Sequence, residues 1–511
     1  MSTPATAPPT NGVQPLVFAP NISNAELSNP EKLIMSKLAA QLLDPMYQQE
    51  MKLSELYEQG LNVVPSLGIS IPPELESLRA VMSWCGTGVA SRSERLSALG
   101  FRMPGQTEVD PTLQEAWQTN ALDAESGLAH DSALIHGRSY AIAGPRPGGG
   151  IPLITIESAT NMIGAFDPRR RSLSAAFQTY HDADPASETY NRQLATLYHR
   201  ESTIQLVRDP EKGWIVQDRN DHNHGIVPVV QFAPRATIIN RLGRSEMNAP
   251  WRNTQDRACR NLQRIDASAE FFATMKIFLL GVTEESFKKA DGKLATVWET
   301  FIGRITALKP DAQGVLPDIK TVPAQSPDGL VTTLEQDRLN MCSHTGLAPQ
   351  YLGIFSDGNP ASADAIRMSD FRLKTIADRL SVSLGNEWEQ LMRIVLHLTG
   401  EYSPAAEQLE TDWAYTGIPT PYADTEMVAR QVEAEMIPRH ADDVLAKVGW
   451  TPVQRERLKA ERARTQGLAV IDQGLDALRG GGGGSQPADG QQPAALIALD
   501  ARRSTDGAVA G

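Results

Sequence analysis

The side chains in this sequence that could most readily take part in catalysis are two histidines, His222 and His224, separated only by Asn223. Imidazoles at short spacing can bind a transition metal, and a metal-activated water can hydrolyse a phosphodiester. Such a site needs further ligands in a fixed geometry, whereas this segment is rich in Asp, Asn and Gly and lies between two expected strands. We therefore favour a turn here and keep a metal-dependent phosphodiesterase as the alternative.

Other patterns that carry chemistry are weak or absent. Asp182, Asp184 and Glu188 could attract a cation, but such a cluster is more typical of a solvated loop. The Gly-rich segment Gly144–Gly150 has no Lys-Ser/Thr after it, so a hairpin connection is favoured over a phosphate-binding loop. No nucleophile elbow of the G-x-S-x-G type occurs. The sequence therefore predicts no catalytic residue, no metal, no cofactor and no enzyme.

Two groups of arginines are candidate contact residues. The run Arg169-Arg170-Arg171 has the composition of a solvated turn, with contact to a partner subunit or nucleic acid as the alternative. Arg257, Arg260 and Arg264 form a stripe beside an apolar stripe on one expected helix. A helix with two different faces often packs on one and pairs charges on the other. We favour subunit contact for this stripe and leave DNA contact and solvent exposure open.

The overall charge argues against a protein that grips DNA tightly. The 511-residue chain has 61 acidic and 48 basic side chains, a net charge of −13 and a pI of about 5.3. Phosphate contacts supply much of the affinity of DNA-binding proteins, and such proteins are usually basic. A DNA-binding protein of another kind remains a second alternative, but DNA is expected to slide past this surface. Three dispersed cysteines and the absence of a signal peptide or membrane segment favour a cytoplasmic site of synthesis.

The hydrophobic pattern predicts an α+β fold that is mainly helical. Helical spacing extends from Glu31 to Leu128 and includes Val81 and Met82. An antiparallel meander is expected next, with strands at 151–156, 175–180, 193–199, 203–207, 214–217 and 226–232. Further elements are a helix from 245 or 248 to about 275, strands at 304–308 and 318–322, and a helix at 330–344 that ends before Gly346.

The most informative segment is the loop that follows Gly346 and precedes a very long helix. Apolar residues keep helical spacing from about Ser362 to Gly400, far beyond the usual length of about 11–12 residues. Judged by its length and composition alone, this loop is an ordinary connection between two helices. Asp357, Gly358 and Asn359 bring conformational freedom and polarity to this loop, which also suits a moving mechanical part. Three shorter helices are expected between Tyr422 and Arg464.

The order of several short motifs resembles the phage portal proteins of the SPP1-like family over roughly residues 31 to 466. The motifs that carry the likeness are Tyr57-Glu58-Gln59-Gly60, the segment from Ala121 to Tyr140, Gly243-Arg244-Ser245, the segment from Thr345 to Arg367, Asp412-Trp413 and Ala423-Asp424. Each motif alone is weak, whereas their order and spacing together are specific.

The resemblance implies a head–tail connector in the virion, usually a dodecameric ring, around a channel for double-stranded DNA. Its implied partners are the terminase large subunit, the major capsid and scaffold proteins, and head-completion or adaptor proteins, with host cytoplasm as the place of assembly and no membrane. The implied tunnel loop that lines the channel comprises Ile354, Phe355, Ser356, Asp357, Gly358, Asn359, Pro360 and Ala361.

The resemblance also implies a division of the protomer into named parts. These are a disordered arm (1–30), a wing (31–240), a first stem helix (241–281), a clip (282–326), a second stem helix (327–346), a tunnel-loop region (347–361), a helix joining wing and crown (362–400), a crown (401–466) and a disordered Gly-rich tail (467–511). The tail, with five consecutive glycines from Gly480, has no counterpart in the family pattern.

Overall fold

The computed structural model describes residues 27–64, 80–106, 108–211, 213–272, 276–280, 318–322, 327–354 and 363–417, with short pieces between 428 and 464. The chain divides into two compact units, Met1–Ile418 and Pro419–Gly511. All twelve strands described belong to the first unit, as do the long helices. The expected disordered arm and tail fall largely outside the described residues, as does the expected strand at 304–308.

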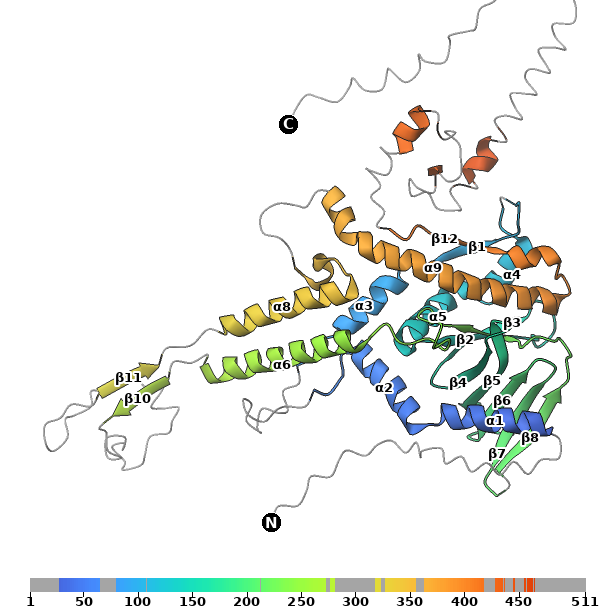
Figure 1. Ribbon diagram of the computed structural model, residues 1–511, viewed down its shortest axis with the longest axis horizontal. Helices are drawn as coiled ribbons and strands as arrows, with labels where there is room; N and C mark the ends of the chain where they lie inside the picture. Colours follow the sequence, from blue (N-terminus) through green and yellow to red (C-terminus); the bar gives the residue numbers. More distant parts are fainter. Residues whose placement is uncertain are drawn as a thin grey trace, which may run out of the picture. The chain divides into compact units, whose positions relative to one another are not determined.

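Two antiparallel sheets form most of the β part of the first unit, and two further strand pairs complete it (Figure 1). The larger is a five-stranded meander of β4 (Met162–Asp167), β5 (Ser172–His181), β6 (Gln193–His199), β7 (Thr203–Asp209) and β8 (Gly213–Asn220). The smaller has the order β3-β2-β9, with β2 at Ser139–Gly144, β3 at Leu153–Ser158 and β9 at Val229–Phe232. The strands expected at 175–180, 193–199, 203–207 and 214–217 are confirmed as part of an antiparallel meander, whereas those expected at 151–156 and 226–232 correspond to β3 and β9 of the smaller sheet.

Helices cover these sheets and supply most of the core. Helix α1 (Asn29–Leu42) begins with a capping box at Ser28 and buries Met35, Leu38 and Leu42 against the meander. Helices α2 (Pro45–Gln59), α3 (Trp84–Ser93), α4 (Pro111–Thr119) and α5 (Leu122–His136) follow. The main core then joins α3, α4 and α5 to the long helix α9 (Ala363–Thr399). No helix among the described residues is long and apolar enough to cross a membrane.

The remaining elements connect distant parts of the chain. Strand β1 (Ala98–Arg102) pairs with β12 (Glu410–Trp413), and η4 (Pro404–Gln408) precedes β12. Helices α6 (Ala249–Phe272) and α8 (Asp328–Thr345) lie side by side, and β10 (Lys276–Leu280) pairs with β11 (Asp318–Val322) beyond them (Figure 1). A short helix η3 (Pro349–Leu352) follows α8.

Several predictions from the sequence were wrong. Val81 and Met82 precede α3 and are not helical, and β1 lies inside the segment that was expected to be helical throughout. Strands β2 and β4 were missed. Both contain small residues, Ala141, Ala143 and Gly164 among them, whose weak strand propensity hides a buried strand. Helix α9 and its stop at Gly400 (φ 79°) are confirmed, as is the α8 stop at Gly346 (φ 76°).

The carboxyl group of Glu387 in α9 has a raised pKa, so its protonated, uncharged form is favoured in the folded chain. Glu387 of α9 accepts a hydrogen bond at Oε1 from the backbone N–H of Ala233 at 2.9 Å, while its Oε2 is buried without a hydrogen-bond partner. Burial raises the pKa of Glu387 to about 8, against the smaller opposing effect of that hydrogen bond. The folded chain therefore keeps this proton up to a much higher pH than the unfolded chain does.

Substituting Glu387→Gln is expected to flatten the pH dependence of stability. With its pKa raised from 4.5 to about 8, Glu387 lowers the free energy of unfolding as pH rises through that interval. The slope is at most about 1.4 kcal/mol per pH unit. Gln keeps the acceptor for the Ala233 N–H and has no proton to lose, so the variant should be more stable than the wild type at pH 8. Chemical denaturation between pH 5 and 8 measures this, with Glu401→Gln at an exposed position as the control. Parallel curves for wild type and Glu387→Gln would contradict the assignment.

Candidate functional site

The paired helices α6 and α8 hold the arginine stripe that the sequence singled out. The apolar side of α6, with Ala258 fully buried, packs into the main core. At the seam between the helices, Asp337 of α8 is 1% exposed, accepts a hydrogen bond from Asn261 Nδ2 at 2.8 Å and forms an ion pair with Arg257. A buried carboxylate with two partners from the facing helix fixes the register of the pair.

The three stripe residues have different surroundings. Arg257 binds Asp337 of its own chain while its side chain stays 48% exposed. Arg264 Nη1 donates to Asn261 Oδ1 at 3.4 Å, and Arg260 is half-buried. The stripe is therefore partly engaged within the protomer. Its proposed contact with a neighbouring subunit or DNA stays a prediction for the exposed part.

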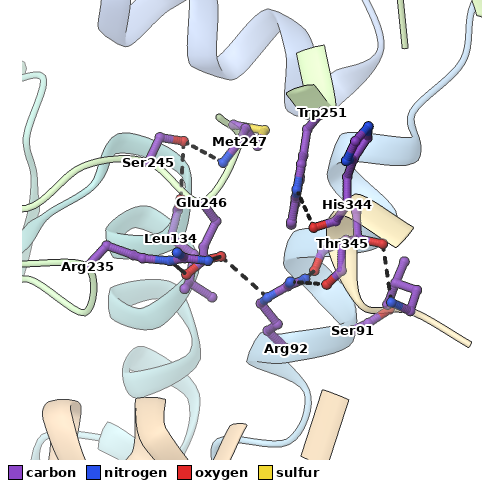
Figure 2. Close-up of polar contacts among 12 residues, drawn as sticks. Ser91, Arg92, Leu134, Arg235, Ser245, Glu246, Met247, Trp251, His344 and Thr345 are labelled. Atoms are coloured by element: carbon purple, nitrogen blue, oxygen red, sulfur yellow. Dashed lines mark hydrogen bonds and ion pairs between the residues drawn. The ribbon is translucent and has the colours of Figure 1, made fainter. Parts of the chain in front are cut away.

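At the other end of this helix pair, the buried guanidinium of Arg92 joins three elements (Figure 2). From α3, Arg92 donates to the carbonyl of Gly88 at 2.6 Å and to that of Thr345, at the end of α8, at 2.5 Å. Its Cζ lies 4.6 Å from the centroid of the Trp251 ring in α6, and Trp251 Nε1 donates to the His344 carbonyl at 3.2 Å. These contacts lock the start of α6 against the end of α8.

Glu246 supplies the negative charge for this cluster (Figure 2). Its carboxylate lies 3.5 Å from Arg92 Nε and accepts hydrogen bonds from Arg235 at 2.5 and 2.7 Å. Burial lowers the pKa of Arg92 to about 10, and Glu246 opposes that effect, so the guanidinium stays charged at neutral pH. Both side chains of the Arg92–Glu246 pair are almost fully buried, which makes each partner costly to remove alone.

Close approach of the backbone brings Glu246 into place. Gly243 has a φ of 77°, and a Cβ there would lie 2.3 Å from the carbonyl oxygen of Gly137. Gly137 has a φ of 87°, and its own Cβ would lie 2.5 Å from the backbone of Arg244. Only glycine fits both positions. These glycines belong to two of the motifs that carry the family resemblance.

A second guanidinium holds both flanks of the loop between α8 and α9. Arg95 follows α3 and forms a bidentate pair with Asp370 of α9, with both N–O distances at 2.8 Å. It also donates to the Tyr351 hydroxyl of η3 at 2.7 Å and to the Thr416 carbonyl at 2.9 Å. Burial opposes the charge of Arg95, but the hydrogen bonds to Asp370 prevail and hold its pKa above the usual value. Residues before and after the loop are thus fixed to one side chain.

The expected tunnel loop begins at the edge of this anchor. Ile354 is half-buried, packs against the main core and donates its N–H to the carbonyl of Pro349 at 3.1 Å. The other loop residues of the prediction, Phe355 to Ala361, lie outside the described residues. The described flanks are well packed, because Leu347, Ala348 and Leu352 are all buried.

Replacing Arg95 with Gln is expected to lower the free energy of unfolding by about 2–4 kcal/mol, because the carboxylate of Asp370 would stay buried without its cation. Asp370 is 3% exposed, so water cannot replace the lost partner without local opening. Thermal denaturation of Arg95→Gln and Arg95→Lys measures the effect. Lys keeps the charge but not the fork, so it should recover only part of the loss. Equal stability of Arg95→Gln and the wild type would show that the anchor is not stabilising.

The other sequence candidates show no arrangement for catalysis. The His222 and His224 rings stack at 4.5 Å between centroids in the turn after β8, and Asn223 has a φ of 52°. Among the described residues, no group of three or more His, Cys, Asp and Glu side chains could hold a metal ion.

The remaining sequence candidates lie in turns and loops. Asp182 and Asp184 accept backbone hydrogen bonds within their own loop, and Gly144–Gly150 connects β2 to β3 as a hairpin. Arg169–Arg171 form the exposed turn between β4 and β5.

Comparisons with known proteins give a consistent result for most of the chain. Residues 40–466 match the family described as phage portal protein, SPP1 Gp6-like. The portal protein of Mycobacterium phage D29 is 30% identical over 443 residues, which is 84% of this chain and 89% of the relative. The portal protein of Mycobacterium phage L5 is 30% identical over 426 residues, 81% of this chain and 85% of the relative.

Among solved structures, chains from gene transfer agent particles match this chain with low TM-scores and low sequence identity. A chain from the neck of an empty particle has a TM-score of 0.40 at 13% identity, covering 75% of this chain and 95% of that chain. A chain from the native virion has a TM-score of 0.39 at 14% identity, covering 75% and 96% respectively.

Proposed function

Because this chain belongs to the SPP1 Gp6-like family of phage portal proteins, we propose that twelve copies close into a ring around a channel for double-stranded DNA. The protein is a structural head–tail connector of the phage virion. The family match over residues 40–466 is the single observation that carries this proposal. Genome packaging and ejection then pass through the ring, and the motor that drives packaging is another protein.

In the proposed ring, the paired helices α6 and α8 serve as the stem, and β11 belongs to the clip. The segment expected as the first stem helix, 241–281, is not helical throughout, because α6 ends at Phe272 and β10 pairs with β11. Residues 31–240 correspond to the wing, and residues 401–466 to the crown. Terminase large subunit, capsid, scaffold and head-completion proteins are the proposed partners, and assembly takes place in the host cytoplasm. The close packing of α6 on α8, with Asp337 sealed between them, supports a rigid stem.

The loop at residues 354–361 is the proposed constriction of the channel. It extends from an anchor that Arg95 makes with Tyr351 on one side and Asp370 on the other. An anchored base lets the intervening residues respond to passing DNA without moving the core. The net charge of −13 supports weak binding of the passing duplex, because an acidic protein does not bind DNA through release of many counterions.

Mass measurement of the purified protein tests the ring. Native mass spectrometry or mass photometry should give a species of about 670 kDa for twelve chains of 55.6 kDa, or a neighbouring cyclic number. A single chain mass at every concentration, together with no multimer in extracts of assembled particles, would contradict the proposal. The double variant His222→Asn with His224→Asn is the control, because a ring should survive the loss of both imidazoles.

A further inference from the structure

A pocket of about 210 Å³ lies where the meander meets the end of α9, and no part of the proposed DNA path uses it. Its ionisable side chains come from four segments: Arg170 before β5, Arg200 after β6, Arg393 and His397 near the end of α9, and Glu407 of η4. Leu173, Ile226, Val227 and Ile394 form apolar parts of the wall. The sequence predicts a solvated turn at Arg170, with contact to a partner subunit or nucleic acid as the alternative.

The charge of this pocket is positive although the chain as a whole is acidic. Three arginines face one lining carboxylate, Glu407, which already accepts a hydrogen bond from the Tyr402 hydroxyl at 2.6 Å. Asp167 lies close by, 3.6 Å from Arg200 and 4.0 Å from Arg170, so it offsets part of their charge. Burial lowers the pKa of His397, so the arginines supply the positive charge at neutral pH.

Arg393 has the least compensated charge of the three. Its Nη1 donates to the backbone carbonyl of Glu407 at a long 3.4 Å, and no carboxylate within the described part of the chain pairs with it. A guanidinium presents a planar fork that matches a carboxylate in two hydrogen bonds. Arg393 therefore has unused donor capacity at the wall of a cavity large enough for a carboxylate side chain.

The position of the pocket on α9 separates it from the loop. Ala363 and Arg393 are thirty residues apart on one continuous helix, so the rise of 1.5 Å per residue places them about 45 Å apart. In the proposed ring we take α9 to extend outward from the loop, so the pocket is available to proteins that surround the ring.

We propose that this pocket binds a carboxylate side chain from an acidic segment of a partner protein, with Arg393 and Arg170 as the principal contacts. A single side chain can enter a cavity of this size, whereas duplex DNA would bring an extended charged surface toward an acidic protein. The proposal rests on the proposed ring for the location of the partner, but the pocket and its charge belong to one protomer.

A fluorescein-labelled hexaglutamate peptide tests the pocket by fluorescence anisotropy at about 50 mM salt, where screening is modest. Arg393→Gln and Arg170→Gln should each weaken binding about fivefold or more, equivalent to about 1 kcal/mol. Arg169→Gln is the matched control, because it removes the same charge from the same exposed turn without lining the pocket. It should change affinity less than twofold. Arg393→Lys should fall between wild type and Arg393→Gln.

Three results would overturn the proposal: no binding by the wild type, an equal loss with Arg169→Gln, or stronger competition by a short DNA duplex than by unlabelled peptide. The last would assign the pocket to phosphate. Thermal denaturation of each variant separates a lost contact from a lost fold. If the chain binds the peptide but forms no ring, the pocket proposal stands and the proposed ring is refuted. If it forms a ring but does not bind the peptide, only the pocket proposal is refuted.

Discussion

A chain that lacks Asp357, Gly358 and Asn359 is expected to form rings at normal yield and to package DNA at least about tenfold less efficiently. A tenfold effect corresponds to about 1.4 kcal/mol on a rate-limiting step. The physical reason is that the two proposed roles belong to different parts of the chain. We expect the proposed ring to depend on the packed helices, and the proposed contact with moving DNA to depend on the residues between the two anchored flanks. Arg95, Tyr351 and Asp370 are untouched by the deletion.

Complementation of a portal-deficient phage measures the packaging defect, and mass measurement of the purified variant measures ring formation. Deleting Gly480, Gly481 and Gly482 is the matched control, because it removes three small residues far along the sequence from the loop. That control should package normally. Unchanged packaging by the loop deletion would refute the role of residues 354–361 as the constriction. Loss of the ring would show that the loop is needed for assembly.

Replacing Glu246 with Ala is expected to lower the free energy of unfolding by about 3–5 kcal/mol, the largest effect of any single substitution proposed for stability. The side chain of Glu246 is fully buried between Arg92 and Arg235, and Arg92 is 1% exposed. Without the carboxylate, the charge of Arg92 remains in the interior beside the Trp251 ring. Because this cluster joins α3 to the ends of α6 and α8, ring yield should fall as well.

Thermal and urea denaturation of Glu246→Ala should be compared with Arg102→Gln. Arg102 pairs with Asp412 at 3.2 Å, but both side chains are more than a third exposed, so its loss should cost less than about 1 kcal/mol. The double variant Arg92→Met with Glu246→Leu should lose less than the sum of its single changes, because no buried charge is stranded. Additive losses, or equal effects of Glu246→Ala and Arg102→Gln, would contradict this account of the cluster.

Sequence patterns predicted those helices and strands whose formation depends on residues near one another in the chain. The spacing of apolar residues in α9 and the glycines after α8 and α9 specify those helices almost to the residue. Strand β6 was predicted with its observed ends at Gln193 and His199. By contrast, β1 pairs with β12, a strand more than 300 residues away, and nothing near Ala98 in the sequence indicates that partner. Pairing at this distance overrides the helical pattern of the surrounding segment.

In the candidate site, the sequence predicted only those residues that recur at helical spacing along one helix. The stripe Arg257, Arg260 and Arg264 is visible from helical spacing, but Arg92 and Arg95 look like ordinary surface charges at the end of a helix. Their burial depends on partners remote in sequence, such as Asp370, which is 275 residues from Arg95. The only local signal was the apolar neighbourhood of Arg92, with Cys85 and Val89 on the preceding turns.

Electron cryomicroscopy of the purified protein, viewed end-on, tests the central claim most directly. The account predicts an annulus of about twelve copies, with a central opening that admits duplex DNA and residues 354–361 nearest the axis. Single compact molecules on the grid, and no annulus at the vertex of assembled particles, would contradict it. So would a closed ring in which residues 354–361 lie on the outer surface.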